Sequence, residues 1–426
     1  MNRVLLVTFH YPPDGGSSGV LRPLKFSKYL IPYGWTPHVL TVRPSMHLQR
    51  DEDLLRDVPA EVVVHRTLAF DSTRHLALGG RYFAFTAVPD AFVTWLPFGI
   101  AEGVRVVRRF GVRAIYSTSP PPTAHLVAGA ISAVTRLPWI ADFRDPWIEE
   151  GLHPRPGTLR WRIEAAMERA VVHRASRVVA TTSWLRRDLL QRYPEAAPER
   201  FRVILNGFDE SDFAAPAPPP RRDQFVLIHA GLITPEFRDP LPLLRSVAEL
   251  IGEGALPRDR VRVILLGGGG YLQSPGFVDA VRPLGLEGVL DVVGRVPYHE
   301  AIRALREASV LLLLQDSEDT RSLIPAKAFE YLRIERPILA LTPDSASAEI
   351  LREWEGCHVV NPRDFASLKE RVRLLYNDWQ QDPGQSARVR AVGRYERRSL
   401  AGELAGLLDE ACGCASASRD TGRPTP

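Results

Sequence analysis

Cysteine is scarce in this sequence, which has only three in 426 residues, at positions 357, 412 and 414. Three thiols cannot form a disulfide framework, and no second cysteine pair or histidine cluster accompanies the pair at 412 and 414. A run of about 18 apolar residues, as a membrane span requires, is also missing. The sequence therefore argues against a disulfide-stapled, zinc-bound or membrane-spanning protein. Residues 1–9 carry no signal-peptide pattern, so we expect a cytoplasmic protein.

The sequence also has little net charge, because its 54 basic residues are nearly balanced by 50 acidic ones. Such a small excess gives no reason to expect a nucleic-acid partner. The charge is unevenly spread, however: residues 1–215 hold 27 basic and 21 acidic residues, and the rest hold 27 and 29. The first half is therefore expected to meet an anionic ligand, or an acidic membrane surface at the inner face of the cytoplasmic membrane.

Two segments bear on such a membrane contact. The most apolar stretch, residues 84–100, contains Asp90 and two prolines, and we interpret it as a loop and a short helix rather than an interfacial anchor. Residues 155–177 carry six arginines among apolar residues such as Trp161 and Met167. This pattern fits either a basic amphipathic helix lying on anionic lipid or a solvated helix face.

Short β-rich runs alternate with helical patterns along both halves of the chain. This alternation is typical of a parallel sheet covered by helices. The sequence thus predicts an α/β fold of two Rossmann-like, doubly wound domains that face each other across a cleft. The predicted strands are residues 4–9, 37–42, 61–65, 114–117, 138–141 and 177–182 in the first half, and 225–230, 261–266, 290–293, 310–314 and 337–341 in the second.

A proline-rich segment separates the two halves. Residues 213–224 contain four prolines and are expected to form a stiff, extended linker. We predict an N-terminal domain over residues 1–212, a C-terminal domain over 225–393, and a helix over 394–411 that packs back on the N-terminal domain. Residues 412–426 are small and polar and are expected to be disordered. Ligands of open α/β sheets bind beyond the carboxyl ends of the strands, so the site is expected between the domains.

Gly15, Gly16 and Ser17 follow the first predicted strand and precede a helix. Glycine lets the backbone approach a ligand closely, and the free amides of a helix start can bind an anion. The glycine spacing is not that of the dinucleotide fingerprint, and a simple tight turn is the alternative. We predict a phosphate- or ligand-binding loop.

Two further motifs follow strands of the first half. Ser119 and His125 flank a proline triplet at a helix start, where His125 is alternatively a buried structural histidine. Asp142, Arg144 and Asp145 follow the next strand. They form either a self-contained ion-pair cluster or part of a site for ligand binding or acid–base chemistry.

The first strand of the second half ends at Gly231, and Arg238 lies just beyond it. A guanidinium fork suits a diphosphate because it makes two parallel charged hydrogen bonds. The four glycines at 267–270 more often form a flexible turn than a phosphate cradle. The first loop of this half is therefore a candidate anion site.

A helix start near Pro325 is the strongest single motif. Free amides at Ala326 and Lys327 face an anion there, and the lysine ammonium adds a positive charge. Glu330, one turn further on, can accept hydrogen bonds from sugar hydroxyls. An ordinary amphipathic helix with an exposed glutamate is the alternative.

In this order and spacing, the motifs resemble the family 4 retaining glycosyltransferases of GT-B architecture, over about residues 1–410. The likeness is strongest to bacterial sugar transferases of surface-polysaccharide or natural-product pathways. The segments that carry the resemblance are residues 11–18, 119–125, 141–147, 203–209, 294–297 and 325–338.

The resemblance implies a nucleotide-sugar donor on the C-terminal domain and an acceptor mainly on the N-terminal one. Glu330 matches the second glutamate of a spaced pair that holds the donor ribose, whereas Ser322 stands where the first would be. Leu232 replaces the family's usual arginine, and Arg238 lies near its usual lysine. Lys327 is expected to compensate for the lost charge.

Other positions carry over from the family one by one. Arg295 and Val296 match the region that borders the nucleotide base. Gly15 and Gly16 match the loop that lines the diphosphate and the acceptor. Ser119 stands where the family often has a histidine.

The resemblance and the charges together predict a hexosyltransferase that is metal-independent, needs no cofactor and retains the anomeric configuration. Its expected catalytic residues are Arg238, Lys327, Glu330 and Asp145. The expected acceptor is a lipid-linked sugar or another anionic or small molecule. Two alternatives stay open. One is a nucleotide-sugar 2-epimerase of the same architecture, and the other is a non-catalytic sugar-nucleotide-binding subunit.

Overall fold

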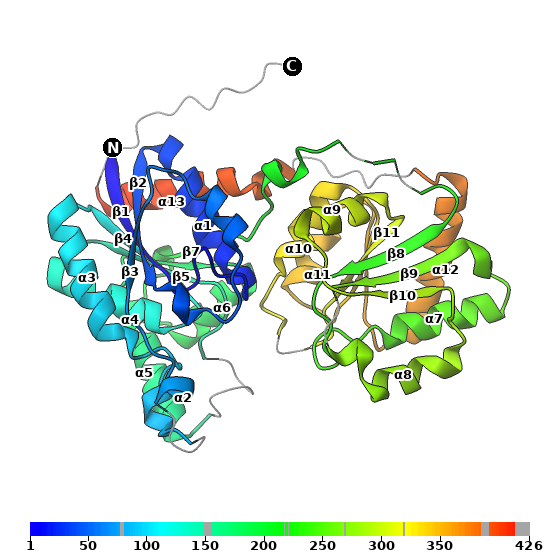
Figure 1. Ribbon diagram of the computed structural model, residues 1–426, viewed down its shortest axis with the longest axis horizontal. Helices are drawn as coiled ribbons and strands as arrows, with labels where there is room; N and C mark the ends of the chain where they lie inside the picture. The colour runs from blue at the N-terminus through cyan, green and yellow to red at the C-terminus, as the bar shows by residue number, and fades with distance from the viewer. Residues whose placement is uncertain are drawn as a thin grey trace. The chain divides into compact units, whose positions relative to one another are not determined.

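The computed structural model describes residues 1–76, 81–148, 156–216, 218–219, 221–267, 270–317, 320–384 and 392–413 (Figure 1). The expectations for the middle of the glycine run at 267–270, for part of the proline-rich linker and for the tail beyond residue 413 lie outside these residues. Contacts divide the chain into two units. Unit 1 is formed by Met1–Asn206 and the segment that begins at Arg397, and unit 2 by Gly207–Glu396.

Unit 1 contains a seven-stranded parallel sheet in the order β3-β2-β1-β4-β5-β6-β7. Residues 4–7 at the centre of this sheet are fully buried, which explains why the sequence shows a continuous apolar run there rather than alternation. The strands are β1 (Asn2–Val7), β2 (Trp35–Val42), β3 (Val63–Thr67), β4 (Ala114–Ser119), β5 (Trp139–Phe143), β6 (Arg177–Ala180) and β7 (Phe201–Val203).

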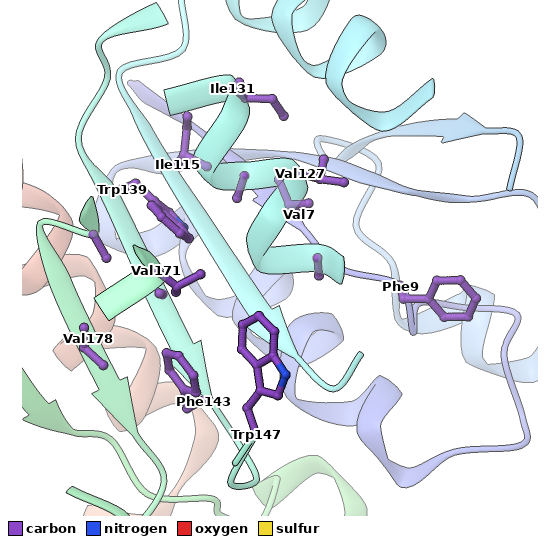
Figure 2. Close-up of a cluster of buried hydrophobic side chains, with 14 of the residues drawn as sticks. Val7, Phe9, Ile115, Val127, Ile131, Trp139, Phe143, Trp147, Val171 and Val178 are labelled. Carbon is purple, nitrogen blue, oxygen red and sulfur yellow. The ribbon is translucent and has the colours of Figure 1, made fainter. Parts of the chain in front are cut away.

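Helices cover both faces of this sheet. Val127 and Ile131 of one helix are buried in the same hydrophobic core as sheet residues such as Ile115 and Trp139 (Figure 2). Burying each such side chain stabilises the unit by about 2–3 kcal/mol. The helices of Met1–Asn206 are α1 (Leu21–Tyr29), α2 (Ser72–His75), α3 (Trp95–Phe110), α4 (Thr123–Thr135), α5 (Leu159–Arg174) and α6 (Ser183–Arg192).

The chain returns to unit 1 with its final described helix, α13 (Arg397–Ala411). Leu400, Leu404 and Leu408 pack in one core with Val4 and Leu6 of β1. Trp35 Nε1 also donates a hydrogen bond to Asp409 at 3.0 Å. The helix is therefore an integral part of unit 1.

Unit 2 contains a six-stranded parallel sheet in the order β10-β9-β8-β11-β12-β13. Its strands are β8 (Phe225–Ala230), β9 (Val261–Leu266), β10 (Leu290–Val293), β11 (Val310–Leu314), β12 (Ile338–Leu341) and β13 (Cys357–Val360). Its helices are α7 (Leu241–Gly252), α8 (Pro275–Val281), α9 (Tyr298–Glu307), α10 (Ala326–Ile334), α11 (Ala346–Arg352) and α12 (Phe365–Gln381).

Both sheets reverse their strand order at one place, between β1 and β4 in unit 1 and between β8 and β11 in unit 2. Loops diverge beyond the carboxyl ends of the strands at such a switch point and leave room for a ligand. The described loops concerned run through residues 8–19 and 120–122 in unit 1, and through 231–240, 315–317 and 320–325 in unit 2. These loops are therefore the expected ligand-binding regions of the two units.

The predicted class of two Rossmann-like α/β domains is confirmed, because both sheets are parallel and covered by helices. Two strands were missed, β7 and β13, which are short and lie at the sheet edges. Within the part of the chain that the structure describes, no helix combines the length and the apolar character needed to cross a membrane.

Candidate functional site

Lys327 is the central side chain at the switch point of unit 2. It lies in the first turn of α10, and its ammonium donates to the carbonyl oxygen of Ala230 at 2.6 Å. It also lies 3.4 Å from Nε2 of the buried His229. His229 Nδ1 faces the Leu312 carbonyl at 3.0 Å, and a carbonyl can only accept, so Nδ1 carries the proton and Nε2 accepts. One of the three lysine donors is left to face a ligand.

The electrostatic surroundings of Lys327 are unfavourable for a cation. Burial, followed by the nearby Arg238, lowers the pKa of Lys327 to about 7. Burial also lowers the pKa of Arg238. No carboxylate among the described residues forms an ion pair with either side chain. The charge of Glu330, one turn along α10, offsets only part of this effect. Two half-buried cations that form no ion pair are typical of a site that receives an anion.

Gly231 makes room for Lys327. Its φ of +129° lies in the region that favours glycine, and a Cβ added there would collide with the lysine Nζ. The same loop contains Thr234, whose Oγ1 is buried and has no hydrogen-bond partner. The Arg238 guanidinium donates to the Leu232 carbonyl at 3.2 Å, across this loop. The loop thus places a hydroxyl and a guanidinium beside the α10 amino terminus.

Glu330 lies one turn along α10 from Lys327. Its Oε1 accepts a hydrogen bond from the Tyr298 hydroxyl at 2.9 Å, and this hydroxyl also lies 3.3 Å from Asp212. The sequence did not reveal that Tyr298 contacts Glu330, because Tyr298 begins a different helix, α9.

The remaining predicted donor residues occupy the same end of unit 2. Ser322 is buried in the loop before α10, whose shape Gln315 fixes by donating to the carbonyls of Thr320 and Leu323. Ala326 is the first residue of α10. Arg295 and Val296 lie between β10 and α9, where the arginine is exposed and the valine half-buried. Four residues near Ser322 were expected to take over the role of the missing glutamate: Asp316, Glu318, Asp319 or Thr320. Of these, Glu318 and Asp319 lie outside the described residues.

The loop after β1 in unit 1 is held in a fixed shape. Gly15 N donates to the Gln49 carbonyl at 3.1 Å, and a Cβ on Gly15 would meet Asp51 at 2.9 Å. Gly16 N donates to Asp14 Oδ1 at 3.0 Å, and the Ser17 hydroxyl accepts from Gly19 N at 3.0 Å. The loop is therefore preorganised, with Gly16 exposed at its surface.

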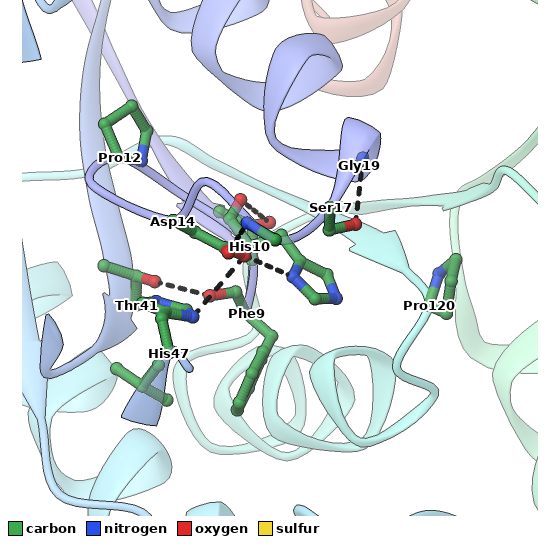
Figure 3. Close-up of polar contacts among 12 residues, drawn as sticks. Phe9, His10, Pro12, Asp14, Ser17, Gly19, Thr41, His47 and Pro120 are labelled. Atoms are coloured by element: carbon green, nitrogen blue, oxygen red, sulfur yellow. Dashed lines mark hydrogen bonds and ion pairs between the residues drawn. The ribbon is translucent and has the colours of Figure 1, made fainter. Parts of the chain in front are cut away.

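His10 was missed by sequence reasoning, although it stands at the end of the first strand. Figure 3 shows its ring directed at Asp14, and Nδ1 lies 2.6 Å from the Asp14 carboxylate. His47 approaches the same oxygen at 3.4 Å. Burial opposes ionisation of Asp14, but the His10 hydrogen bond and the His47 charge lower its pKa overall. A histidine four residues before an aspartate, after a strand, was the available signal.

His10, Asp14 and His47 could together offer three ligand atoms to a metal, since these atoms lie within 4.8 Å of one another. Two ligands of one tetrahedral zinc ion are about 3.3 Å apart. The 2.6 Å between His10 and Asp14 is instead the length of a strong hydrogen bond. The group fits a proton-linked network better than a metal centre.

Asp142 lies where a ligand cannot reach it, which corrects its assignment to the acceptor site. Its carboxylate is fully buried and receives both arms of the Arg22 guanidinium at 2.8 and 2.9 Å. The Tyr116 and Thr118 hydroxyls also donate to it, at 2.6 and 2.8 Å. Burial opposes the charge, but Arg22 and these donors lower the pKa of Asp142. The self-contained ion pair, one of the two predicted alternatives, is the one observed.

Arg144 is likewise used within unit 1. It is buried and donates to the carbonyls of Gly19, Ser119 and Pro120. It thereby ties the glycine-rich loop to the end of β4. Asp145, by contrast, is exposed and remains a candidate to orient an acceptor.

His125 is also structural, as the alternative interpretation held. Its ring is fully buried, and Nδ1 lies 2.8 Å from the Ser117 hydroxyl. Burial lowers the pKa of His125 to about 3, so the ring is neutral. It packs against Phe143 at a centroid distance of 4.6 Å.

Comparison with known proteins adds to this geometry. The family model for the glycosyl transferase 4-like domain matches residues 6–207. A D-inositol 3-phosphate glycosyltransferase of Kineococcus radiotolerans is 35% identical over 162 residues, which are 35% of this chain and 37% of that protein. The chain therefore aligns with little more than a third of the length of that relative.

Two solved structures show the same fold across the chain. HepE of Anabaena in complex with UDP-glucose has a TM-score of 0.65 at 16% identity, covering 96% of this chain and 100% of that one. A UDP-N-acetylglucosamine 2-epimerase from Listeria monocytogenes, described as uncertain in function, has a TM-score of 0.54 at 13% identity, covering 96% of each chain.

Two parallel, helix-covered sheets, each with polar groups at its switch point, define a protein of the GT-B architecture. Its residues 6–207, a little under half of the chain, match the model of the glycosyl transferase 4-like domain, which agrees with the resemblance seen in the sequence.

Proposed function

We propose that this protein transfers a sugar, of the hexosyl type, from a nucleotide-sugar donor to an acceptor hydroxyl. The observation that carries the proposal is the unneutralised pair of cations, Lys327 and Arg238, at the amino terminus of α10. A diphosphate supplies the missing negative charge, and the free amides of the helix start add donors.

In this proposal, unit 2 holds the donor. Lys327, Arg238 and the Ala326 amide bind the diphosphate, while Glu330 accepts hydrogen bonds from the ribose hydroxyls. Arg295 and Val296 border the base. The complex of HepE with UDP-glucose makes a uridine donor the first to test.

The reaction breaks the bond between the anomeric carbon and the phosphate oxygen. The acceptor oxygen forms its new bond on the same face of the sugar, so the configuration is retained, and its proton passes to the departing phosphate. Lys327 and Arg238 stabilise the charge that develops on that phosphate, which lets the step proceed without a metal or cofactor. Gly16, Ser17 and Asp145 are the candidates to position the acceptor.

The acceptor is proposed to be anionic, such as a lipid-linked sugar, because the basic excess of the sequence lies in its first half. The reaction would then take place in the cytoplasm at the inner face of the membrane.

The donor site is tested first by thermal shift with a panel of nucleotide sugars, since a preferred donor raises Tm by mass action. Glu330→Ala and Arg238→Ala are each expected to reduce transfer strongly and leave Tm of the free protein nearly unchanged. Arg352→Ala is the matched control, because Arg352 pairs only with Asp344 at an exposed surface. Normal turnover in both site variants would contradict the proposal.

Metal independence is tested by removing divalent ions with a chelator. Turnover is expected to be unchanged after this treatment. Turnover that disappears and returns on adding back a divalent ion would refute that part of the mechanism.

The structural similarity to a 2-epimerase keeps a second candidate in view. Incubating the preferred nucleotide sugar without acceptor distinguishes the two, because an epimerase forms a new sugar nucleotide and a transferase does not. Tight nucleotide binding with no product across a broad acceptor panel would instead identify the non-catalytic subunit.

A further inference from the structure

Unit 1 carries a group of large apolar side chains that the fold leaves in solvent. Phe85 is 75% exposed and Phe83 is 68% exposed, which makes them the most exposed aromatic rings of the described residues. Leu159, at the first position of α5, is 74% exposed. Such exposure costs solubility and is uncommon in a single surface region without a binding role.

These side chains lie on segments that are tied together. Arg160, next to Leu159, donates to the carbonyls of Ala87 and Pro89 at 3.3 and 3.2 Å. The 3-10 turn Ala84–Ala87 that carries Phe85 is therefore attached to the start of α5. Helix α2 also contacts this turn. The apolar side chains thus belong to one surface.

The fold explains why α5 leaves Leu159 outside. The helix turns Trp161, Met167 and Val171 toward the core of unit 1. The amphipathic face predicted for residues 155–177 is therefore used inside the protein, and that helix face is not free to meet lipid. The exposed apolar side chains instead come from the beginning of α5 and from the turn near residues 82–85, which the sequence did not mark as an anchor.

Among the described residues of these segments, the exposed charged side chains are basic. Arg74, Arg81 and Arg162 are exposed there. The acidic residues of the same described segments are turned to the backbone: Asp71 accepts from Thr73, and Asp90 is held by the amides of neighbouring loops. An apolar surface rimmed by arginine is complementary to an anionic bilayer.

We propose that this surface, the aromatic–basic patch, docks the protein on an anionic lipid bilayer. The patch consists of Arg81, Tyr82, Phe83, Phe85, Leu159 and Arg162. The aromatic rings enter the headgroup region, where amphipathic rings are favoured, and the guanidinium groups pair with lipid phosphates. Docking needs neither donor nor acceptor, so it stands or falls independently of the proposed transfer.

The test is flotation of the full chain with vesicles of phosphatidylglycerol and phosphatidylcholine, against vesicles of phosphatidylcholine alone. The protein is expected to float with the anionic vesicles and to bind the neutral ones about tenfold more weakly. The double variant Phe83→Ser with Phe85→Ser is expected to bind anionic vesicles about tenfold more weakly than the natural chain. Arg81→Gln with Arg162→Gln is expected to weaken binding and its sensitivity to salt.

Matched controls come from other exposed positions of unit 1. Leu55→Ser with Val134→Ser removes two apolar side chains that are 40% and 55% exposed, and Arg108→Gln with Arg109→Gln removes two exposed charges. Both pairs are expected to bind vesicles normally. Unfolding curves and nucleotide-induced shifts in Tm, measured on each variant, show that the fold and unit 2 are intact.

Three results would overturn the proposal. The first is that the natural chain binds no vesicle. The second is that the double phenylalanine variant binds anionic vesicles as well as the natural chain. The third is that both control pairs lose as much vesicle binding as the patch variants. A chain that instead self-associates, and becomes monomeric only in the phenylalanine variant, would assign the patch to a second copy of the protein.

Discussion

Units 1 and 2 both place charged side chains at the switch point of a parallel sheet, but they use those charges differently. In unit 1, Arg22 and Asp142 form a buried ion pair, and the Arg144 guanidinium donates hydrogen bonds to three backbone carbonyls. In unit 2, Lys327 and Arg238 have no carboxylate partner among the described residues. The difference separates groups that hold a fold together from groups that await a ligand, even though the two sets look alike in a sequence.

The sharpest test of this contrast is Arg22→Leu. Removing the guanidinium leaves the Asp142 charge buried with only two hydroxyl partners, which is expected to destabilise unit 1 by about 3–5 kcal/mol. Hydrogen exchange at the amides of β4 and β5 measures the effect. Arg333→Leu is the control, because its pair with Glu210 is exposed and is worth about 1 kcal/mol or less. Equal losses of stability in the two variants would show that the buried Arg22–Asp142 pair contributes no more to the fold than an exposed pair.

Lys327→Met should show the opposite behaviour. Transfer is expected to fall about a hundredfold or more, because one charge on the leaving phosphate is lost. Tm of the free protein should stay the same or rise, because a half-buried cation that forms no ion pair is removed, which offsets the loss of its hydrogen bond to Ala230. Steady-state kinetics and thermal unfolding report the two effects. Lys369→Met, which disrupts an exposed pair with Glu249 and Glu253, is the control. A large drop in Tm would make Lys327 structural after all.

The pKa of Lys327, lowered to about 7, makes donor binding depend on pH. Below pH 7 the ammonium is already charged, so affinity for a nucleotide sugar should be flat. Above pH 7 binding must take up a proton, because the diphosphate raises the lysine pKa, and affinity should fall by up to about tenfold per pH unit.

Calorimetry in two buffers of different protonation enthalpy measures this proton uptake directly. UDP-glucose is a suitable probe, because its diphosphate carries no group that titrates near neutral pH. Lys327→Met should bind weakly at every pH without the slope, and a slope that survives in this variant would assign the titration to another group.

Tyr298→Phe should have the smallest effect. It removes one hydrogen bond to Glu330, and that carboxylate then loses its fixed orientation, at a cost of about 1 kcal/mol. Donor KM is expected to rise about fivefold with kcat nearly unchanged. An unchanged KM would show that Glu330 is positioned by other contacts.

The fold could be predicted from the sequence because buried parallel strands appear as short apolar runs between helical patterns. The residues that we propose for the donor site could also be picked out, since Pro325, Lys327 and Glu330 are close in sequence and lie at one helix start. Asp142 could not be interpreted in this way: its partner Arg22 lies 120 positions away, and only packing brings the two together.

The exposure of Phe83 and Phe85 could not be predicted from the sequence either. Phe83 and Phe85 look like ordinary core residues, and nothing local indicates which way a ring will face. The neighbouring segment is held by Arg160 of α5, which is more than 70 positions away in the sequence and donates to the Ala87 and Pro89 carbonyls.

The position of α13 has a consequence for how the chain is made. Leu400, Leu404 and Leu408 complete a core that begins with Val4 and Leu6. A ribosome releases those leucines only after Gly207–Glu396 has emerged. Unit 2, made from one uninterrupted stretch, can therefore finish folding first, while the earlier-synthesised unit 1 waits with an open apolar surface that chaperones would recognise.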